Sequence, residues 1–390
     1  MKKFATQLGC SISVITLSLP AVAGFTFGQA DTDSGALTIS GAVRANFQDK
    51  HYGEDADDQK IKFDAAILKV AYESPDWFGN AEYRCYQYDQ FCDFSTLVYG
   101  YAGYHINPTD QITVGLQPIP FGPGRFWDSS FYASLNNTIG LQDVHNLGLN
   151  YHFELPSATK LDLAYFIEDG GHYHGDSHDA ARYSANLVKS SDPSKTQLKE
   201  KNMWIVRVIQ DMNLPAAMDL KSTIGASYWY SDIDNKKTDS DGSRKAWSIF
   251  GSLKYHNFST SLTAGKLSID NKDVLSPNSS VFGSFESEYE LANEGYFYTF
   301  DSRYAVQNLR PNLTVSPYLM LSAYDKKQHD FKDSQRHALG VAWDYKNVSL
   351  YTEYLMSKND AFIGGNLASL AKGDDDQWNK LFNMMLIYSF

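Results

Sequence analysis

The chain has 390 residues and a formal net charge of −12 at neutral pH. Binding to nucleic acid requires a basic face, so this charge argues against that class of function. The composition is rich in aromatic residues, with 26 Tyr and 23 Phe. The sequence lacks both a run of about 20 apolar residues and the apolar period of amphipathic helices, which disfavours helical membrane proteins and helical soluble enzymes.

The first 23 residues are typical of an export signal. Two lysines follow the initial methionine, an uncharged stretch runs to Pro20, and Ala21-Val22-Ala23 forms a small-residue cleavage site. The stretch is too short and too often interrupted by Ser, Thr and Pro to serve as a membrane anchor. We therefore expect residues 1–23 to be removed and residues 24–390 to form a single domain.

The remaining sequence predicts sixteen β-strands, in which apolar and polar residues alternate and turn-forming residues mark the ends. The predicted strands cover residues 36–47, 60–73, 78–88, 95–106, 111–117, 144–154, 160–168, 201–211, 220–231, 245–255, 258–267, 295–306, 313–324, 336–345, 348–357 and 379–390. An even number suits a closed antiparallel transmembrane β-barrel whose ends lie on one side of the membrane. Counts of about 14 or 18 remain compatible with the pattern.

The connections between the predicted strands alternate in length. The short ones contain turn formers, as in Ser74-Pro75-Asp76 and Asn107-Pro108-Thr109-Asp110. The long ones are polar and span residues 48–59, 89–94, 118–143, 169–200, 232–244, 268–294, 325–335 and 358–378. Barrels of the Gram-negative outer membrane combine short periplasmic turns with long extracellular loops in this way. The pattern predicts such a barrel, in contact with membrane lipid and lipopolysaccharide.

Alternation within a strand also predicts which side chains face lipid. In the segment 295–306, Tyr298 and Phe300 lie on one face while Thr299 and Asp301 lie on the other. Lipid takes the apolar face, because an Arg or Lys at the bilayer midplane costs about 2–4 kcal/mol.

The last predicted strand has an aromatic or apolar residue at every second position up to Phe390. Phe382, Met384, Leu386 and Tyr388 complete this series. The pattern resembles the C-terminal signature by which the barrel assembly machinery recognises outer-membrane barrels. It implies that this machinery is a partner of the chain.

The third long connection follows the segment Gly115-Leu116-Gln117-Pro118-Ile119-Pro120-Phe121-Gly122. Sixteen strands with a long third loop here resemble the general porins, in which that loop folds inward and narrows the pore. The resemblance implies a homotrimer, without cofactor, through which small hydrophilic solutes or ions diffuse passively. The Gly-x-x-x-x-Pro-Phe-Gly run is itself similar to a short segment of the phosphate-selective porin O/P family, whose pores are expected to carry Arg and Lys ladders.

Charged residues on the polar strand faces and in the loop 118–143 are candidates for a pore constriction. We expect two residues of the loop to face charged side chains of the wall. The candidate set is Arg125, Asp128, Arg44, Glu82, Arg84, Arg207, Asp301 and Arg303. Opposed charges would orient water and pass small hydrophilic solutes. Because acids and bases are mixed, phosphate selectivity does not follow, and selectivity for phosphate, dicarboxylates or sugars stays open as an alternative.

Four aromatic residues of the same loop, Phe126, Trp127, Phe131 and Tyr132, have two interpretations. Their ring faces could stack on sugar rings and guide a solute, or they could pack the loop onto the barrel wall. We favour the second interpretation.

Cysteine and histidine residues suggest two further features. Cys85 and Cys92 flank a short connection, and an oxidising compartment favours a disulfide between them over two free thiols. His172, His174 and His178 lie close together with two aspartates, a donor set that suits zinc or copper. A solvated loop without metal is the simpler interpretation, and we predict no cofactor.

We expect no enzymatic activity, because the sequence has no nucleophile motif and no metalloprotease motif. An outer-membrane hydrolase stays open as an alternative in which a strand histidine neighbours a serine. The strand histidines are His105, His145, His152 and His337. An adhesin or receptor is another alternative, in which the loops 169–200 and 268–294 bind a ligand outside the cell.

Overall fold

The structure, a computed structural model, describes residues 24–53, 59–170, 179–212 and 219–390. The predicted export signal lies outside the described residues, and so do His172, His174 and His178. Within the described ranges, no helix is long and apolar enough to cross a membrane.

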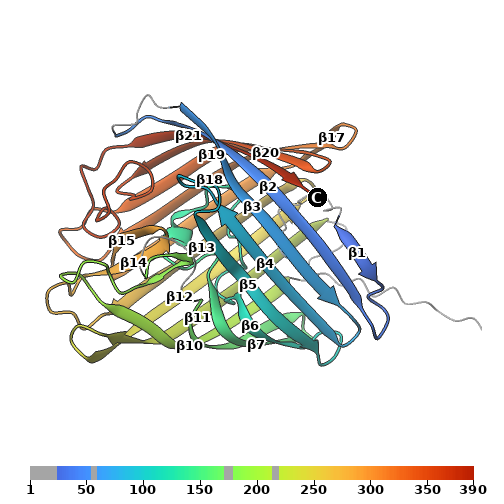
Figure 1. The fold of residues 1–390 in the computed structure, drawn as a ribbon, viewed down its shortest axis with the longest axis horizontal. Helices are drawn as coiled ribbons and strands as arrows, with labels where there is room; N and C mark the ends of the chain where they lie inside the picture. The colour runs from blue at the N-terminus through green and yellow to red at the C-terminus, as the bar shows by residue number, and fades with distance from the viewer. Residues whose placement is uncertain (1–23, 54–58, 171–178, 213–218) are drawn as a thin grey trace, which may run out of the picture.

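Sixteen long antiparallel strands form a closed barrel, and this confirms the predicted fold (Figure 1). They are β2 (Ala36–Lys50), β3 (Gln59–Glu73), β4 (Trp77–Tyr86), β5 (Phe94–His105), β6 (Gln111–Pro118), β7 (His145–Leu155), β8 (Thr159–Asp169), β10 (Leu198–Met212), β11 (Leu220–Asn235), β12 (Ser240–Tyr255), β13 (Phe258–Asp270), β16 (Glu294–Tyr304), β18 (Leu313–Lys326), β19 (Ser334–Tyr345), β20 (Val348–Lys358) and β21 (Asn379–Ser389). Each overlaps one predicted segment. Pairing of β21 with β2, from Ala42↔Ser389 to Lys50↔Leu381, closes the barrel.

Two short strands extend the wall at the end of the barrel where the C-terminus lies, which we call the turn end (Figure 1). β1 (Phe25–Gly28) pairs with the first residues of β2, beyond the point where β21 stops. β17 (Val306–Arg310) continues the course of β16 and pairs with β18. The long connections gather at the opposite end, which we call the loop end.

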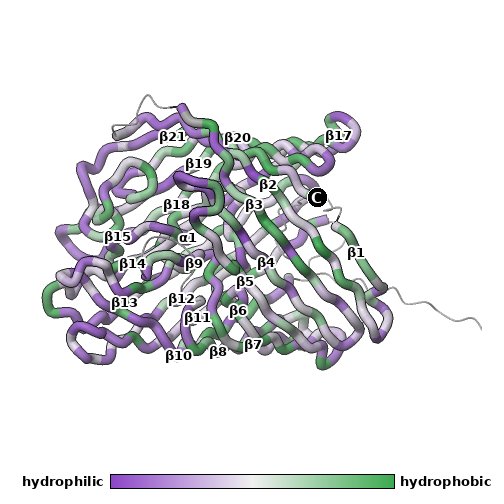
Figure 2. The backbone as a smooth tube through the Cα atoms, in the orientation of Figure 1, coloured by the Kyte–Doolittle hydropathy of each residue, from purple (hydrophilic) through white to green (hydrophobic). Residues whose placement is uncertain are grey.

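The outer face of the wall is apolar, as the alternation predicts. In β19, Leu339 is 64 % exposed, whereas its neighbours Ala338 and Gly340 are buried. Trp343 and Tyr345 also point outward, whereas Ala342, which precedes Trp343, is buried. Figure 2 shows green apolar residues along the strands and mainly purple hydrophilic residues in the loops at the loop end. A barrel of this kind satisfies its backbone hydrogen bonds within the sheet and can present apolar side chains to lipid.

The lumen contains a three-stranded inner sheet that the sequence did not predict. It is formed by β9 (Arg182–Leu187), β14 (Ser279–Phe285) and β15 (Ser287–Ala292), which belong to the predicted loops 169–200 and 268–294. Every residue of β9 is buried. Figure 1 shows β14 and β15 toward the loop end of the barrel. The described parts of these two loops therefore fold into the barrel instead of forming free surface loops.

An apolar core fills the lumen beside the inner sheet. Its largest members come from the third loop, the inner sheet and the inner face of the wall between β8 and β18. They include Phe121, Trp127, Phe166, Trp229, Phe282, Tyr289, Phe297 and Tyr324. All of these side chains are almost completely buried. This part of the lumen is packed like the interior of a soluble protein, whereas partly exposed charges line the inner faces of β2, β3 and β4.

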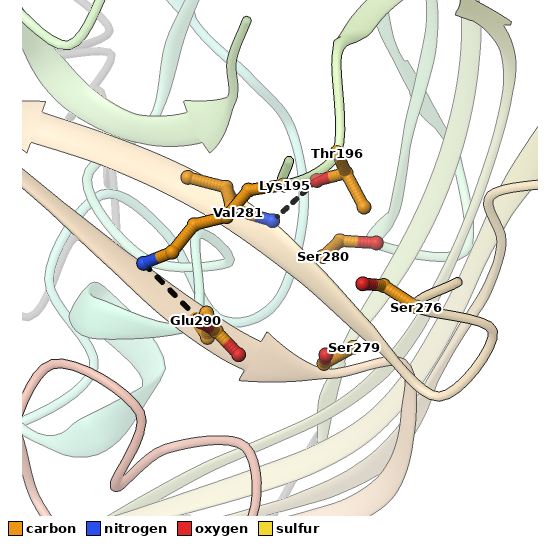
Figure 3. Close-up of a pocket in the computed structure, with 7 residues that line it drawn as sticks. All are labelled: Lys195, Thr196, Ser276, Ser279, Ser280, Val281 and Glu290. Atoms are coloured by element: carbon orange, nitrogen blue, oxygen red, sulfur yellow. Dashed lines mark hydrogen bonds and ion pairs between the residues drawn. The ribbon is translucent and has the colours of Figure 1, made fainter. Parts of the chain in front are cut away.

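A small polar pocket marks the contact between the two inward-folded loops (Figure 3). Lys195 Nζ lies 3.3 Å from Glu290 Oε1, and the Val281 amide donates to Thr196 Oγ1 at 2.9 Å. Three serines, Ser276, Ser279 and Ser280, complete the lining. Because Thr196 comes from one loop and Val281 from the other, these contacts join the loops into one body.

Candidate functional site

The segment 119–144 between β6 and β7 folds into the barrel, and we call it loop 3. It includes the single helical turn α1 (Leu135–Thr138). Asp301 of β16 accepts hydrogen bonds from the amide and the hydroxyl of Ser129, both at 2.8 Å. Glu353 of β20 accepts one from the amide of Phe131 at 2.9 Å. Since β16 and β20 are far from β6 and β7 around the barrel, loop 3 crosses the lumen.

Two buried arginines hold the second half of loop 3. Arg336 of β19 donates to the carbonyl of Ala133 at 3.2 Å, and Arg244 of β12 donates to the carbonyl of Gly140 at 2.7 Å. Each also has a buried carboxylate partner, which is Asp360 in the case of Arg336. A guanidinium offers several N–H donors in one plane, so it binds a carboxylate and a backbone carbonyl together. These contacts fix loop 3 against the wall.

Five charged side chains gather where the two ends of loop 3 meet the neighbouring part of the wall, at β3 and β4. Lys69 comes from β3, Glu82 and Arg84 come from β4, and Arg125 and Asp143 come from loop 3. We call this group the charge cluster. Arg84 Nε donates to Glu82 Oε1 at 2.6 Å. Glu82 Oε2 lies 3.6 Å from Lys69 Nζ and 4.0 Å from Arg125 Nη1. Arg125 also pairs with Asp143, so opposite charges join the loop to the wall.

Aromatic rings cover the guanidinium groups of the charge cluster. The guanidinium carbon of Arg84 lies 5.1 Å from the ring centre of Tyr183, in β9. That of Arg125 lies 5.4 Å from Tyr99 and 4.8 Å from Phe126. Such stacking is favourable and restricts the orientation of each guanidinium. The inner sheet, the wall and loop 3 thus all contribute to the cluster.

A second ion pair lies beside the cluster on β2 and β3. Arg44 Nη2 is 2.5 Å from Asp64 Oδ2, and its guanidinium lies between the rings of Tyr86 and Phe131 at 5.5 and 5.4 Å. In the pairing of β2 with β3, Arg44 faces Ala65 while the next residue of β2 faces Phe63, so Asp64 is an extra residue. This bulge turns Asp64 inward, where it reaches Arg44.

Other predicted site residues lie nearer the turn end or inside loop 3. Arg207 pairs with Asp162 at 2.8 Å, and Arg303 Nη2 lies 3.8 Å from a carboxylate oxygen of Asp344. Asp128 is buried and accepts hydrogen bonds from amides of loop 3 itself. The structure therefore brings Arg125, Arg44, Glu82 and Arg84 together on one side of the lumen. It places Arg207 and Arg303 apart from them, and Asp128 and Asp301 hold the loop.

No protein-family model and no curated protein matches the sequence, but solved structures match the fold. OmpT of Vibrio cholerae, in its trimer form, has a TM-score of 0.58 at 12 % identity, with 92 % of this chain and 100 % of that chain covered. The outer membrane channel DcaP of Acinetobacter baumannii gives 0.60 at 13 %, covering 93 % and 100 %. OmpF of Salmonella typhi gives 0.58 at 12 %, covering 94 % and 100 %. The chain has the fold of an outer-membrane porin.

Within this porin fold, the four aromatic residues of loop 3 divide into two kinds. Trp127 is buried between Phe121 and the wall, and Tyr132 donates from its hydroxyl to the carbonyl of Phe362. Phe126 remains 36 % exposed, and Phe131 is partly buried against Tyr351. Two rings therefore pack or anchor the loop, and Phe126 is the one with a substantial face open to solvent.

The porin-like barrel carries a disulfide between Cys85 and Cys92. It links the end of β4 to the start of β5 at the loop end. The backbone near it is held further by Asp93, which accepts hydrogen bonds from the amides of Tyr88, Asp89 and Gln90. The second long connection of the barrel is thus tied down.

The strand histidines have separate surroundings in the barrel. His105 Nε2 contacts Glu73, His152 Nδ1 contacts Asp162, and His145 is buried between aromatic rings. Among the residues that the structure describes, no hydrogen bond joins one of these imidazoles to a serine hydroxyl. The described residues also include no group of three or more His, Cys, Asp or Glu side chains placed to hold a metal ion. Porins are generally not enzymes.

Several residues of the site were missed in the sequence. Lys69 belongs to the charge cluster, Tyr183 stacks on it, and Arg336 holds loop 3. Lys69 could have been found, because it lies on the inward face of β3 in the alternating pattern. The roles of Tyr183 and Arg336 depend on the course of the inner sheet and of loop 3, which strand alternation does not reveal.

Proposed function

We propose that the chain is an outer-membrane channel through which small hydrophilic solutes or ions diffuse passively. The observation that carries this proposal is the position of the charge cluster. Loop 3 crosses the lumen and is fixed to β16 and β20, and partly exposed charges remain between it and β2, β3 and β4. Charged groups lining a narrow passage orient water and favour polar solutes over apolar ones.

The proposal includes the orientation and surroundings of the channel. The turn end faces the periplasm and the loop end faces the exterior, as in other outer-membrane barrels. The outer face contacts lipid and lipopolysaccharide, and the barrel assembly machinery inserts the chain. A homotrimer is the proposed assembly, and its support is that the similar OmpT structure is in trimer form. Chemical crosslinking of purified membranes should yield a species of three chains, and a monomer alone would contradict this part.

Liposome swelling tests the channel itself. Liposomes containing the purified chain should swell in isotonic arabinose or glycine, because these polar solutes enter through the lumen. A scaffold that only displays loops to an external ligand would leave the liposomes unswollen. The described parts of the loops proposed for that role are largely buried inside the barrel.

Single-channel recording tests the site. Arg125→Ala should change the conductance and the ion preference, because Arg125 joins loop 3 to the charge cluster. Lys199→Ala is the matched control. It also removes one positive charge, but Lys199 is 47 % exposed and pairs with Glu168 at the loop end. Equal effects of the two variants, or no effect of either, would show that the charge cluster is not the constriction.

A further inference from the structure

The charge cluster contains more cations than carboxylates. Its cations are Lys69, Arg84 and Arg125, and its carboxylates are Glu82 and Asp143. Three positive and two negative charges leave a net charge of one positive. The neighbouring pair of Arg44 and Asp64 is neutral and does not alter this balance.

The two signs of charge differ in how far they reach into solvent. The side chain of Lys69 is 36 % exposed and that of Arg125 is 20 % exposed, whereas that of Glu82 is 1 % exposed. Asp143 is also nearly buried, at 8 %. An ion moving past the cluster therefore meets the cations at closer range than the carboxylates, and Coulomb attraction falls with distance.

The donors around Glu82 hold its carboxylate in the way that they would hold the carboxylate of a solute. Its Oε1 is reached by Arg84 through Nε at 2.6 Å and through Nη2 at 2.5 Å. Its Oε2 accepts a hydrogen bond from the Tyr99 hydroxyl at 3.0 Å, with Lys69 nearby. Guanidinium, phenol and ammonium donors together form a site that matches a carboxylate. In the folded chain, Glu82 itself occupies that site.

We infer that the charge cluster selects small carboxylate anions and that Glu82 is a built-in competitor that keeps their binding weak. The inference rests on the channel function proposed above and names its preferred solute class. A channel must attract a solute enough to admit it and hold it weakly enough to release it. Without Glu82, three cations would hold a carboxylate too firmly for rapid passage. With Glu82 present, a passing carboxylate interacts with Lys69 and Arg125, which also contact Glu82. It does not displace the Glu82 carboxylate from Arg84.

Reversal potentials across a gradient of KCl test the sign of the selectivity. The wild-type channel should prefer chloride over potassium, and Glu82→Gln should raise the chloride preference several-fold. Asp211→Asn is the matched control, because it also removes one negative charge but lies near the turn end and pairs with Lys160. An equal shift in the two variants, or a wild-type channel that prefers potassium, would overturn the inference.

Block by carboxylates tests the competition. Malonate added to a chloride solution should reduce the wild-type current only at high concentration. In Glu82→Gln it should reduce the current at a several-fold lower concentration, because the donors freed from Glu82 bind the added carboxylate. Unchanged block in Glu82→Gln would show that Glu82 does not compete with the solute.

A second variant keeps the inference testable if Glu82→Gln fails to fold. Lys69→Met removes a partly exposed cation and should lower the chloride preference and weaken the block by malonate. If Lys69→Met leaves both unchanged, the inference fails even when Glu82→Gln does not insert. A wild-type chain that gives no conductance would instead contradict the proposed channel function. Conductance without chloride preference would leave that function intact and refute only the carboxylate selectivity.

Discussion

Arg336 and Asp360 form a two-point ion pair inside the barrel, with Nε 2.7 Å from Oδ2 and Nη2 2.8 Å from Oδ1. The two side chains are 2 % and 0 % exposed. Arg336 also donates to the carbonyl of Ala133 in loop 3, and Asp360 accepts a hydrogen bond from the amide of Phe362. One buried pair thus connects loop 3, β19 and the last long loop, residues 359–378.

Removal of one partner should destabilise the barrel strongly. Asp360→Ala leaves the Arg336 guanidinium buried without its carboxylate, and breaking a buried pair in this way costs about 3–5 kcal/mol. Lys358→Ala breaks a partly exposed pair with Asp376 instead and should cost less than about 1 kcal/mol. Urea unfolding in detergent micelles, followed by tryptophan fluorescence, measures both. Similar losses in the two variants would contradict the role of the buried pair.

Acid should weaken the same attachment. Burial raises the pKa of Asp360, but the charge and hydrogen bonds of Arg336 outweigh burial and hold the pKa below its ordinary value. The ionised carboxylate therefore stabilises the fold above about pH 4, and this contribution is lost as the pH falls through the lowered pKa. The melting temperature of the wild type should drop between pH 5 and pH 3 by more than that of Asp360→Asn. Equal drops would show that Asp360 makes no such contribution.

Loss of the Glu353 carboxylate should loosen loop 3. Glu353 accepts hydrogen bonds from the Ser130 hydroxyl, the amides of Phe131 and Tyr132, and the Tyr318 hydroxyl. In Glu353→Gln, an NH2 group replaces one carboxylate oxygen. Because NH2 cannot accept a hydrogen bond, some of these donors are left unpaired. Single-channel currents should become noisier. Asp344→Asn is the control, because it changes an inward-facing carboxylate near the turn end. It should leave the current noise unchanged.

Truncation of Phe282 should test the apolar core of the lumen. Phe282 of β14 is completely buried, stacks on Tyr289 and lies near the guanidinium of Arg244. Phe282→Ala should cost about 3–5 kcal/mol, because a cavity replaces the ring. Phe27→Ala, on the exposed strand β1, should cost much less. A small loss for Phe282→Ala in the same urea experiment would mean that the inner sheet does not contribute to stability.

The wall could be predicted from the sequence because each strand has two unlike environments. Leu339 and Trp343 face outward while Ala338 and Ala342 face inward, and a period of two follows from that difference. All sixteen wall strands were found for this reason. The inner sheet gave no such signal. Its strand β9 is buried on both faces along its whole length, so no difference in exposure between the faces imposes an alternation of polar and apolar residues.

The positions of the candidate site's side chains could be predicted mainly where they belong to the wall. Glu82 and Arg84 lie two residues apart on β4, and alternation alone places both on the inner face. Asp143 pairs with Arg125 because the two ends of loop 3 come together, with the Asp143 amide donating to the Arg125 carbonyl at 3.1 Å. Asp301 was assigned correctly to the inner face, but its partner Ser129 depends on the path of the loop. Contacts between distant segments carry no local pattern.

The apolar core of the lumen gives this barrel a water-excluded interior that lipid does not touch. Exposure of apolar surface on unfolding raises the heat capacity. In a barrel whose lumen is lined by polar side chains alone, that exposure comes chiefly from side chains already in contact with detergent or lipid. Here Trp127, Phe282 and Phe297 leave a protein interior and enter water. The heat capacity of unfolding should therefore be closer to that of a soluble domain and depend less on the surrounding lipid.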